Sequence, residues 1–265
     1  MSDRRPSMRH PEHDRLCDEV RSWYRTPSEA IGYSIERRRF GFYRHNTANP
    51  DSARLIVDGA TPGDVPAMLS DAADYFGDRE VKIWIDDHGT DNVLGPALQA
   101  SGCARENATI FLAHTGSITP VSARADVSIE TVTPATLAEY MNVKLKGFAN
   151  SEDEPAAERV AEETAARAAE LRGPGKFFIA RLKGEAAAVL AYYAGDDRLI
   201  FNLATRVPMR NQGLAKILLC GAIGRGCRNT IINTDPDDTP INWYRRLGFD
   251  DEIYWLRNYA YRRAS

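Results

Sequence analysis

The sequence predicts an α/β chain in which one order of strands and helices occurs twice. In the first half, residues 62–77 carry apolar side chains at a helical period, and residues 80–86 alternate as a strand does. In the second half, a strand at 198–207 runs into an apolar helical pattern from residue 214, and a strand at 229–234 follows. The two halves therefore share an alternation of element types that is typical of α/β units.

The remaining predicted elements complete the pattern in each half. In the first half they are strands at 53–59 and 108–114 and a helix at 92–102. In the second half they are a strand at 127–132, helices at 133–147, 156–173 and 239–249, a β-hairpin at 176–195 with its turn at Lys183-Gly184, and a strand at 252–262.

Two stretches look like copies of one unit. Residues 81–103 and 229–249 share an order of strand, acidic loop, helix and glycine, with the glycines at Gly102 and Gly248. Chance similarity of two generic βαβ pieces is the alternative. On the first interpretation the chain divides into a flexible tail at 1–14, a first unit at 15–118, a linker at 119–126 and a second unit at 127–265.

Composition limits the classes of function. The formal net charge is −3 over 265 residues, which argues against a nucleic-acid partner. No apolar run is long enough to span a bilayer, and the charged N-terminus lacks the apolar segment of a signal peptide. The four cysteines form no CxxC pair, so we expect a cytoplasmic protein without a membrane partner. His10, His13 and Cys17 fit no common zinc spacing, and no metal is expected.

The turn before the helix at residue 214 is suited to an anion. Its sequence, Arg210-Asn211-Gln212-Gly213, is polar and ends in a glycine where the helix should begin. A helix N-terminus leaves backbone N–H groups unpaired and carries partial positive charge. Gly213 lacks the Cβ that would hinder a close anion, and Arg210 and Lys216 add mobile positive charge. The turn is therefore predicted to hold a phosphate or pyrophosphate.

Two motifs make the second half resemble the GNAT superfamily of N-acetyltransferases. Arg210, Gly213 and Ala215 match the acetyl-CoA signature R/Q-x-x-G-x-G/A, and "WYRRLGF" at 243–249 resembles the helix-end motif of the family. The resemblance covers about residues 127–262. It implies the acyl-CoA N-acyltransferase fold, with a mixed, mainly antiparallel sheet that splays at its centre and has helices on both faces.

The resemblance also implies roles for particular residues. Tyr244 matches the tyrosine that protonates the leaving thiolate of coenzyme A, although its ring could simply pack beside the thioester. The main chain of Leu203 and Thr205 would pair with the pantetheine arm, and an N–H of Leu203 or Ala204 would stabilise the oxyanion. The pyrophosphate would be held by a run of residues that share the helix start: Arg210, Asn211, Gln212, Gly213, Leu214, Ala215 and Lys216.

Some positions depart from the family pattern. Asp237 stands where the family often has asparagine, and Asn242 is a candidate replacement near the pantetheine. The dipeptide Arg198-Leu199 fills the place of a frequent glutamate base, and no histidine lies beyond His114. The amine must therefore lose its proton to water or to a carboxylate elsewhere.

The acceptor side of the site is less defined by sequence. Glu152, Asp153 and Glu154 are candidates for attracting a cationic amine, or they form a solvated acidic loop before a helix. Asn202 lies in the middle of a predicted strand and points either into the cleft or to the other face of the sheet.

The first half lacks this equipment. It has no Arg-x-x-Gly-x-Ala at its helix start, and Leu98 stands at the position of Tyr244 when Gly102 is aligned with Gly248. We therefore expect a degenerate GNAT-like unit and a single active site. The first half would then extend the sheet, wall the acceptor cleft or form a dimer surface.

These observations lead to one expected function. The chain should move an acetyl group from acetyl-CoA to a primary amine of a small molecule or peptide by direct attack, without Cys220 or Cys227 as nucleophile. The alternatives are a non-catalytic acyl-CoA-binding regulator and an interaction scaffold. The acceptor and the oligomeric state, including a homodimer, are left open by the sequence.

Overall fold

The computed structural model describes residues 11–25, 33–46, 49–115, 121–122, 124–223, 227–238 and 240–263. Its elements in the first half are α1 (Pro11–Arg25), β1 (Tyr33–Arg38), β2 (Gly41–Asn46), β3 (Asn49–Val57), η2 (Pro62–Asp64), α2 (Val65–Phe76), β4 (Val81–Ile85), α3 (His88–Ala100) and β5 (Ala104–Thr115). Those in the second half are β6 (Val127–Thr131), α4 (Leu137–Ala149), α5 (Ala157–Arg172), β7 (Gly175–Leu182), β8 (Glu185–Tyr193), β9 (Arg198–Thr205), η3 (Val207–Met209), α6 (Leu214–Ile223), β10 (Asn229–Thr234), α7 (Pro240–Arg246) and β11 (Asp251–Tyr261).

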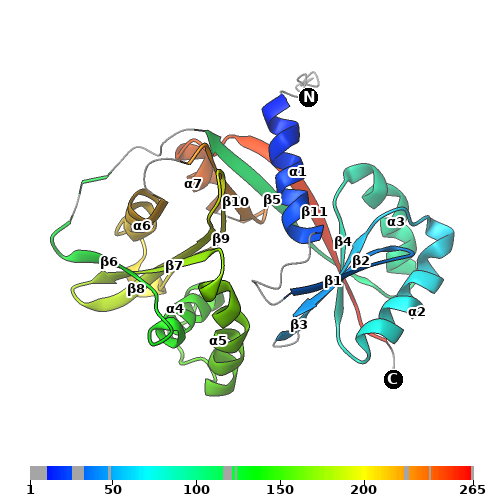
Figure 1. Ribbon diagram of the computed structural model, residues 1–265, viewed down its shortest axis with the longest axis horizontal. Coiled ribbons are helices and arrows are strands. Elements are labelled where there is room, and N and C mark those ends of the chain that lie inside the picture. The colour runs from blue at the N-terminus through cyan, green and yellow to red at the C-terminus, as the bar shows by residue number, and fades with distance from the viewer. Residues whose placement is uncertain are drawn as a thin grey trace.

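All the described strands form one eleven-stranded sheet in the order β1-β2-β3-β4-β11-β5-β10-β9-β8-β7-β6. The pairs β3–β4 and β9–β10 are parallel, and the other pairs are antiparallel. Helices cover both faces, and α1 lies between the two lobes of the molecule (Figure 1). The mixed, mainly antiparallel sheet expected from the sequence is therefore confirmed.

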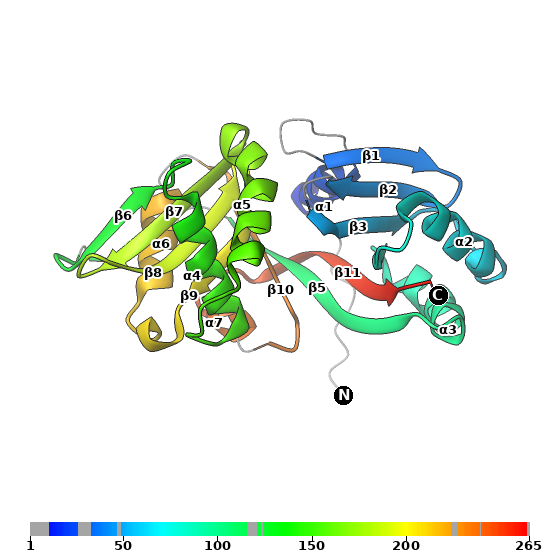
Figure 2. The same ribbon diagram turned by 90° about the horizontal axis from the view of Figure 1, so that it is seen from below.

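The two halves exchange their last strands. β5 of the first half pairs with β10 and β11, and β11 of the second half pairs with β4 and β5. Both neighbours of β5 therefore come from the second half, and both neighbours of β11 come from the first half. The two long strands cross between the lobes (Figure 2). The division of the chain at 119–126 stays a prediction. Backbone hydrogen bonds join the two halves into one sheet.

Four apolar clusters correspond to this arrangement. One packs α6 and α7 against one face of the second lobe, and another packs α4 and α5 against the opposite face. A third fills the first lobe beneath α2 and α3. The fourth joins the lobes, because Leu16 and Val20 of α1 pack with Phe111, Ile231 and Tyr254 from β5, β10 and β11. The hydrophobic contribution of α1 therefore stabilises the junction of the two halves.

Local patterns identified most elements correctly. The hairpin β7–β8 is confirmed, and its turn residues Lys183 and Gly184 both have positive φ, 52° and 88°, as a two-residue type I′ turn requires. The repeat is also seen in the backbone, since Gly102 and Gly248 follow α3 and α7 with φ of 86° and 92°. Gly248 has a second reason, because a Cβ there would lie 3.0 Å from Cδ2 of His114.

Other local predictions need correction. The tail predicted at 1–14 is wrong for residues 11–14, which form the first turn of α1, while residues 1–10 lie outside the described part. The helix expected from residue 133 begins at Leu137, because Thr133 and Thr136 form a turn in which the Thr133 N–H donates to Thr136 Oγ1 at 2.9 Å. β1 and β2 were not predicted, since their side chains alternate only weakly.

Within the described ranges, no helix has both the length and the apolar character needed to cross a bilayer. The same ranges hold no group of three or more His, Cys, Asp or Glu side chains placed to bind a metal ion. His10, one of the three residues considered for a metal, lies outside them.

Candidate functional site

The central strands of the second lobe separate. β9 pairs with β10 only at Arg198, Leu199 and Ile200, although β9 continues to Thr205. On its other side β9 stays paired with β8 through Thr205. From Phe201 onward, therefore, the β10 side of β9 is an edge without a strand partner among the described strands, and the splay expected from the sequence is present.

The direction of the β9 backbone groups decides which residues serve this open edge. The N–H of Arg206 donates to the carbonyl of Ala187 at 3.0 Å, so Arg206 faces β8. Backbone groups alternate along an antiparallel strand, so Ala204 also faces β8, whereas Leu203 and Thr205 face the open edge. Leu203 and Thr205 have the backbone direction that an added strand needs, although Thr205 O also accepts from Arg210 Nε, and their pairing with pantetheine stays a prediction. Ala204 is a correction, because β8 already engages its main chain and its N–H cannot reach an oxyanion.

A bulge marks the point at which the splay begins. The β8–β9 register skips from Ala191–Asn202 to Tyr192–Ile200, which leaves Phe201 as the additional residue on β9. A bulge of this kind redirects a side chain and interrupts the ladder. It places the N–H of Leu203 a short way beyond the last β10 pair, next to the gap between the strands.

The turn after β9 leaves a run of main-chain amides open. Among the described residues, none accepts from the N–H groups from Asn211 to Lys216, and the first amide of α6 that is bonded belongs to Ile217, which donates to Gly213 O at 3.0 Å. Asn211 and Gly213 have positive φ, 60° and 77°, and a Cβ on Gly213 would meet no atom within 4 Å. Successive amides in such a turn, with the dipole of α6 behind them, form an anion-binding concavity.

Arg210 has a different role from the one expected. Its Nη2 donates to Gly147 O at 2.9 Å and to Asn150 Oδ1 at 2.6 Å, and its Nε donates to Thr205 O at 3.2 Å. The guanidinium is therefore a tie between the end of α4, the end of β9 and the turn, rather than a mobile charge for a phosphate. Lys216, by contrast, has no ion pair among the described residues.

Tyr244 lies on the same face of the sheet as α6. It is buried, with 7% of its surface exposed, and packs in the cluster that contains Leu203, Leu214 and Phe249. Burial, and then the nearby Asp238, raise the pKa of the phenol well above its ordinary value. The phenol therefore stays protonated at neutral pH, as a proton donor requires. Asn242 is exposed on the same short helix.

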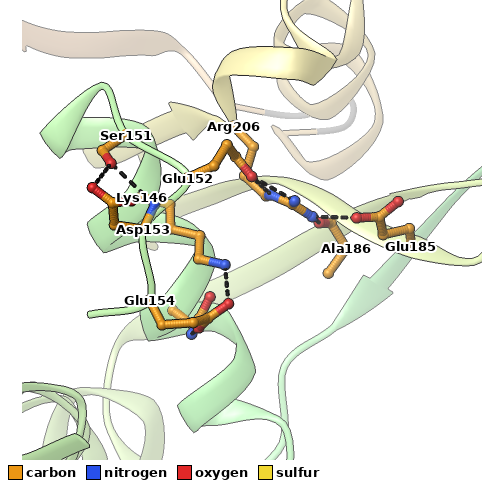
Figure 3. A network of polar contacts seen from close by, with 9 residues as sticks. Lys146, Ser151, Glu152, Asp153, Glu154, Glu185, Ala186 and Arg206 are labelled. Carbon is orange, nitrogen blue, oxygen red and sulfur yellow. Dashed lines mark hydrogen bonds and ion pairs between the residues drawn. The ribbon is translucent and has the colours of Figure 1, made fainter. Parts of the chain in front are cut away.

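The acidic loop before α5 is occupied by partners within the chain. Glu152 Oε2 accepts from Arg206 Nε at 2.9 Å and from Nη2 at 2.5 Å, and the same guanidinium reaches Glu185 Oε1 at 2.5 Å (Figure 3). Glu154 is held by Lys146 and Asn142. Both bonds from Arg206 go to Oε2, and Oε1 of Glu152 is buried without a partner among the described residues. The charge of Glu152 is thus already paired within the chain, and its role in binding the acceptor stays a prediction.

Asn202 resolves one of the alternatives left open by the sequence. Its side chain is buried on the α4–α5 face, beside Tyr140, which lies in the cluster of that face. Asn202 therefore points away from the face that holds Tyr244. Its Nδ2 meets no acceptor among the described residues.

Sequence reasoning missed two groups near the site because they come from the first half. His114 of β5 lies against β10 and has its ring 5.3 Å from that of Phe249, so an imidazole does stand in the second lobe. Glu19 of α1 pairs with Arg15 at 2.9 Å. Burial, and then the neighbouring Asp197 carboxylate, raise the pKa of Glu19 to about 7. No local pattern in the sequence shows that β5 and α1 of the first half pack against the second half, so these two residues could not be placed near the site from the sequence.

An open strand edge beside a helix start with free amides is suited to an extended ligand that ends in a phosphate group. Residues 141–249 match the model of the acetyltransferase (GNAT) family. The match lies within the second half and includes both sequence motifs, at 210–215 and 243–249. No curated protein sequence matches the chain.

Solved structures share the fold along nearly the whole chain. A GCN5-related N-acetyltransferase from Kribbella flavida has a TM-score of 0.60 at 17% identity and covers 95% of each chain. A functionally unknown conserved protein from Staphylococcus epidermidis has a TM-score of 0.69 at 13% identity, over 88% of this chain and 96% of that one. A tandem GNAT protein from the clavulanic acid biosynthesis pathway has a TM-score of 0.57 at 15% identity, over 94% and 88%. The first half therefore shares in a tandem GNAT fold.

Proposed function

We propose that the chain transfers an acetyl group from acetyl-CoA to a primary amine. The observation that carries the proposal is the run of unpaired amides from Asn211 to Lys216 beside the unpaired edge of β9. A diphosphate and an extended arm need these two features at adjacent places. The match of residues 141–249 to the GNAT family supports an acyltransferase.

The reaction follows from the groups around the gap. The amine nitrogen forms a bond to the thioester carbonyl carbon, and the Leu203 N–H on the open edge donates to the oxygen that becomes negative. The tetrahedral intermediate collapses with loss of the C–S bond. The sulfur leaves as a thiolate and takes the phenolic proton of Tyr244, while the amine gives its proton to water or a carboxylate.

Two measurements test the proposal. Acetyl-CoA at one hundred times its Kd should stabilise the protein by about 2.7 kcal/mol in thermal unfolding. Free thiol should then appear when a panel of primary amines is added. A protein that is neither stabilised by acetyl-CoA nor releases thiol is an interaction scaffold, and the proposal fails.

A further inference from the structure

A partly open cavity lies at the junction of the two halves, on the α5 side of β9. Its volume is about 410 Å³, which is within the range of small-ligand sites. The first half contributes α1, β1 and β2 to its wall, and the second half contributes α5 and the ends of β8 and β9. The function proposed above assigns no role to this cavity.

The cavity reaches the point where the central strands separate. Leu199 and Phe201 of β9 both line it, and Phe201 is the bulge residue at the start of the splay. The ring of Phe201 stacks on that of Tyr193, with centroids 4.4 Å apart. A molecule in the cavity would therefore stand beside the open edge of β9, where an acyl group on a pantetheine arm would end.

Two guanidinium groups line this space, that of Arg44, which is buried, and that of Arg167, which is half-buried. Arg44 of β2 is 8% exposed, lies over the ring of Tyr33 at 3.7 Å, and has no ion pair among the described residues. Arg167 of α5 bonds Glu170 Oε1 at 2.5 Å. The buried Glu170 carboxylate acts electrostatically on both guanidinium groups, and Glu163 acts on Arg167 as well.

The hydrogen bonds of these charged groups are incomplete, and Glu170 Oε2 is also buried without a partner among the described residues. The Nε atoms of Arg44 and Arg167 are both buried, and the described residues provide no acceptor for either. A buried cation that is incompletely neutralised is unfavourable, so an anionic ligand group would stabilise the wall.

The rest of the wall suits the other parts of a small amine. Aromatic rings line the cavity and can cover an apolar body: Trp23, Tyr24, Tyr33, Tyr193 and Phe201. Glu19 also lines it, and an ammonium group would share its carboxylate with Arg15, which pairs with Glu19 at 2.9 Å. Opposite charges on one wall match a molecule that carries both an amine and an acid.

We infer that this cavity is the acceptor site and that it selects a small primary amine that also carries an anionic group, carboxylate or phosphate, bound by Arg44 with Arg167. This inference rests on the proposed acetyl transfer for its chemistry. It gives the first half a specific task, because Arg44 and the aromatic rings of α1 and β1 come from there.

Matched pairs of amines test the inference. Amino acids with aromatic, aliphatic and polar side chains are compared with their decarboxylated amines, and phosphoethanolamine is compared with ethanolamine. Binding is measured by calorimetry without a donor and again with coenzyme A, and turnover by thiol release. We expect the acidic member of at least one pair to bind roughly 10- to 100-fold more tightly, as a charge-assisted hydrogen bond implies. The carboxylate and phosphate pairs distinguish the two sources of charge.

Variants separate recognition from folding. Arg44→Gln should remove the preference for the acidic member, Arg44→Lys should restore part of it, and Arg39→Gln, on an exposed arginine of the same hairpin, should leave it unchanged. Stabilisation by acetyl-CoA should be the same in all three variants. Equal binding within every pair, no binding of any acidic amine, or a preference that survives Arg44→Gln would overturn the inference. If an acidic amine binds in an Arg44-dependent way but acetyl-CoA has no effect, the cavity does bind such amines and acetyl-CoA is not the donor.

Discussion

The two halves contain the same strand–helix unit in a closed and an open form. In the first half β3 pairs with β4 up to Ile56, one residue before β3 ends at Val57. In the second half β9 leaves β10 after Ile200, five residues before its end at Thr205. Of these two parallel pairs, only the second therefore leaves a long unpaired stretch at the carboxyl-terminal end of its first strand, where the turn to the next helix begins.

The starts of α2 and α6 also differ, because the first is capped by a side chain and the second is open. At the entry to η2 and α2, Asp64 Oδ2 accepts from the Thr61 N–H at 3.0 Å and from its hydroxyl at 2.6 Å, so the chain supplies its own anion. At the entry to α6 no side chain takes that place among the described residues. With a paired strand end and a filled cap, the first unit offers neither the open edge nor the free amides on which the proposed acetyl-CoA site depends.

The largest effect on activity is expected for a change at Tyr244, whose counterpart in the first unit is Leu98. Tyr244→Phe should lower the rate of thiol release about 10²- to 10⁴-fold, because the thiolate loses its proton donor. Stabilisation by acetyl-CoA should not change, since the ring remains. Leu98→Phe serves as a control in the first unit and should leave the rate unchanged. Normal acetyl-CoA binding with no turnover, in the unaltered protein and in Tyr244→Phe alike, would instead identify an acyl-CoA-binding regulator.

The next effect concerns the open turn. Gly213 has φ of 77° and open space at its Cβ, so Gly213→Val acts through backbone strain rather than through a clash. We expect the amides to move and acetyl-CoA affinity to fall roughly 10- to 100-fold by calorimetry. Gly59→Val is matched, because Gly59 has φ of 84° and open space in the first half. If Gly59→Val weakens acetyl-CoA binding equally, the turn at Gly213 is not the anion site.

A smaller effect is expected at Arg210. Arg210→Gln removes the tie to Gly147 and Thr205, so we expect a loss of about 1 kcal/mol in the free energy of unfolding. Acetyl-CoA affinity should fall only a few-fold, with an unchanged dependence on salt. A steep loss of affinity together with a weaker salt dependence would show that Arg210 contacts a phosphate instead.

The smallest effect tests the filled cap of the first half. Hydrogen bonds from the Thr61 hydroxyl, then from its N–H, lower the pKa of Asp64. A carboxyl whose pKa is lower in the folded state stabilises the fold above its unfolded pKa, and the stabilisation is lost as the pH falls through the folded pKa. The melting temperature of Asp64→Asn should therefore lie slightly below that of the unaltered protein at pH 7, and the two should converge as the pH falls through the lowered pKa of Asp64. A difference that stays constant with pH contradicts the role of the carboxylate.

Short stretches of the sequence are enough to specify the local features of this protein. The turn from Arg210 to Gly213, the hairpin at Lys183-Gly184 and the helix end at Gly248 are set by glycines and by neighbours within a few residues. The order of elements and the family motif follow from the same short-range patterns, because helical and strand periods are local properties of a chain.

Contacts between residues that are distant in the sequence arise only when the chain folds. Strand partners are chosen by packing over long separations, so no local pattern shows that β5 and β11 exchange places or that His114 lies beside Phe249. The tie from Arg210 to Gly147 joins residues 63 positions apart. The cavity between Arg44 and Arg167 exists for the same reason, since its two walls belong to different halves of the chain.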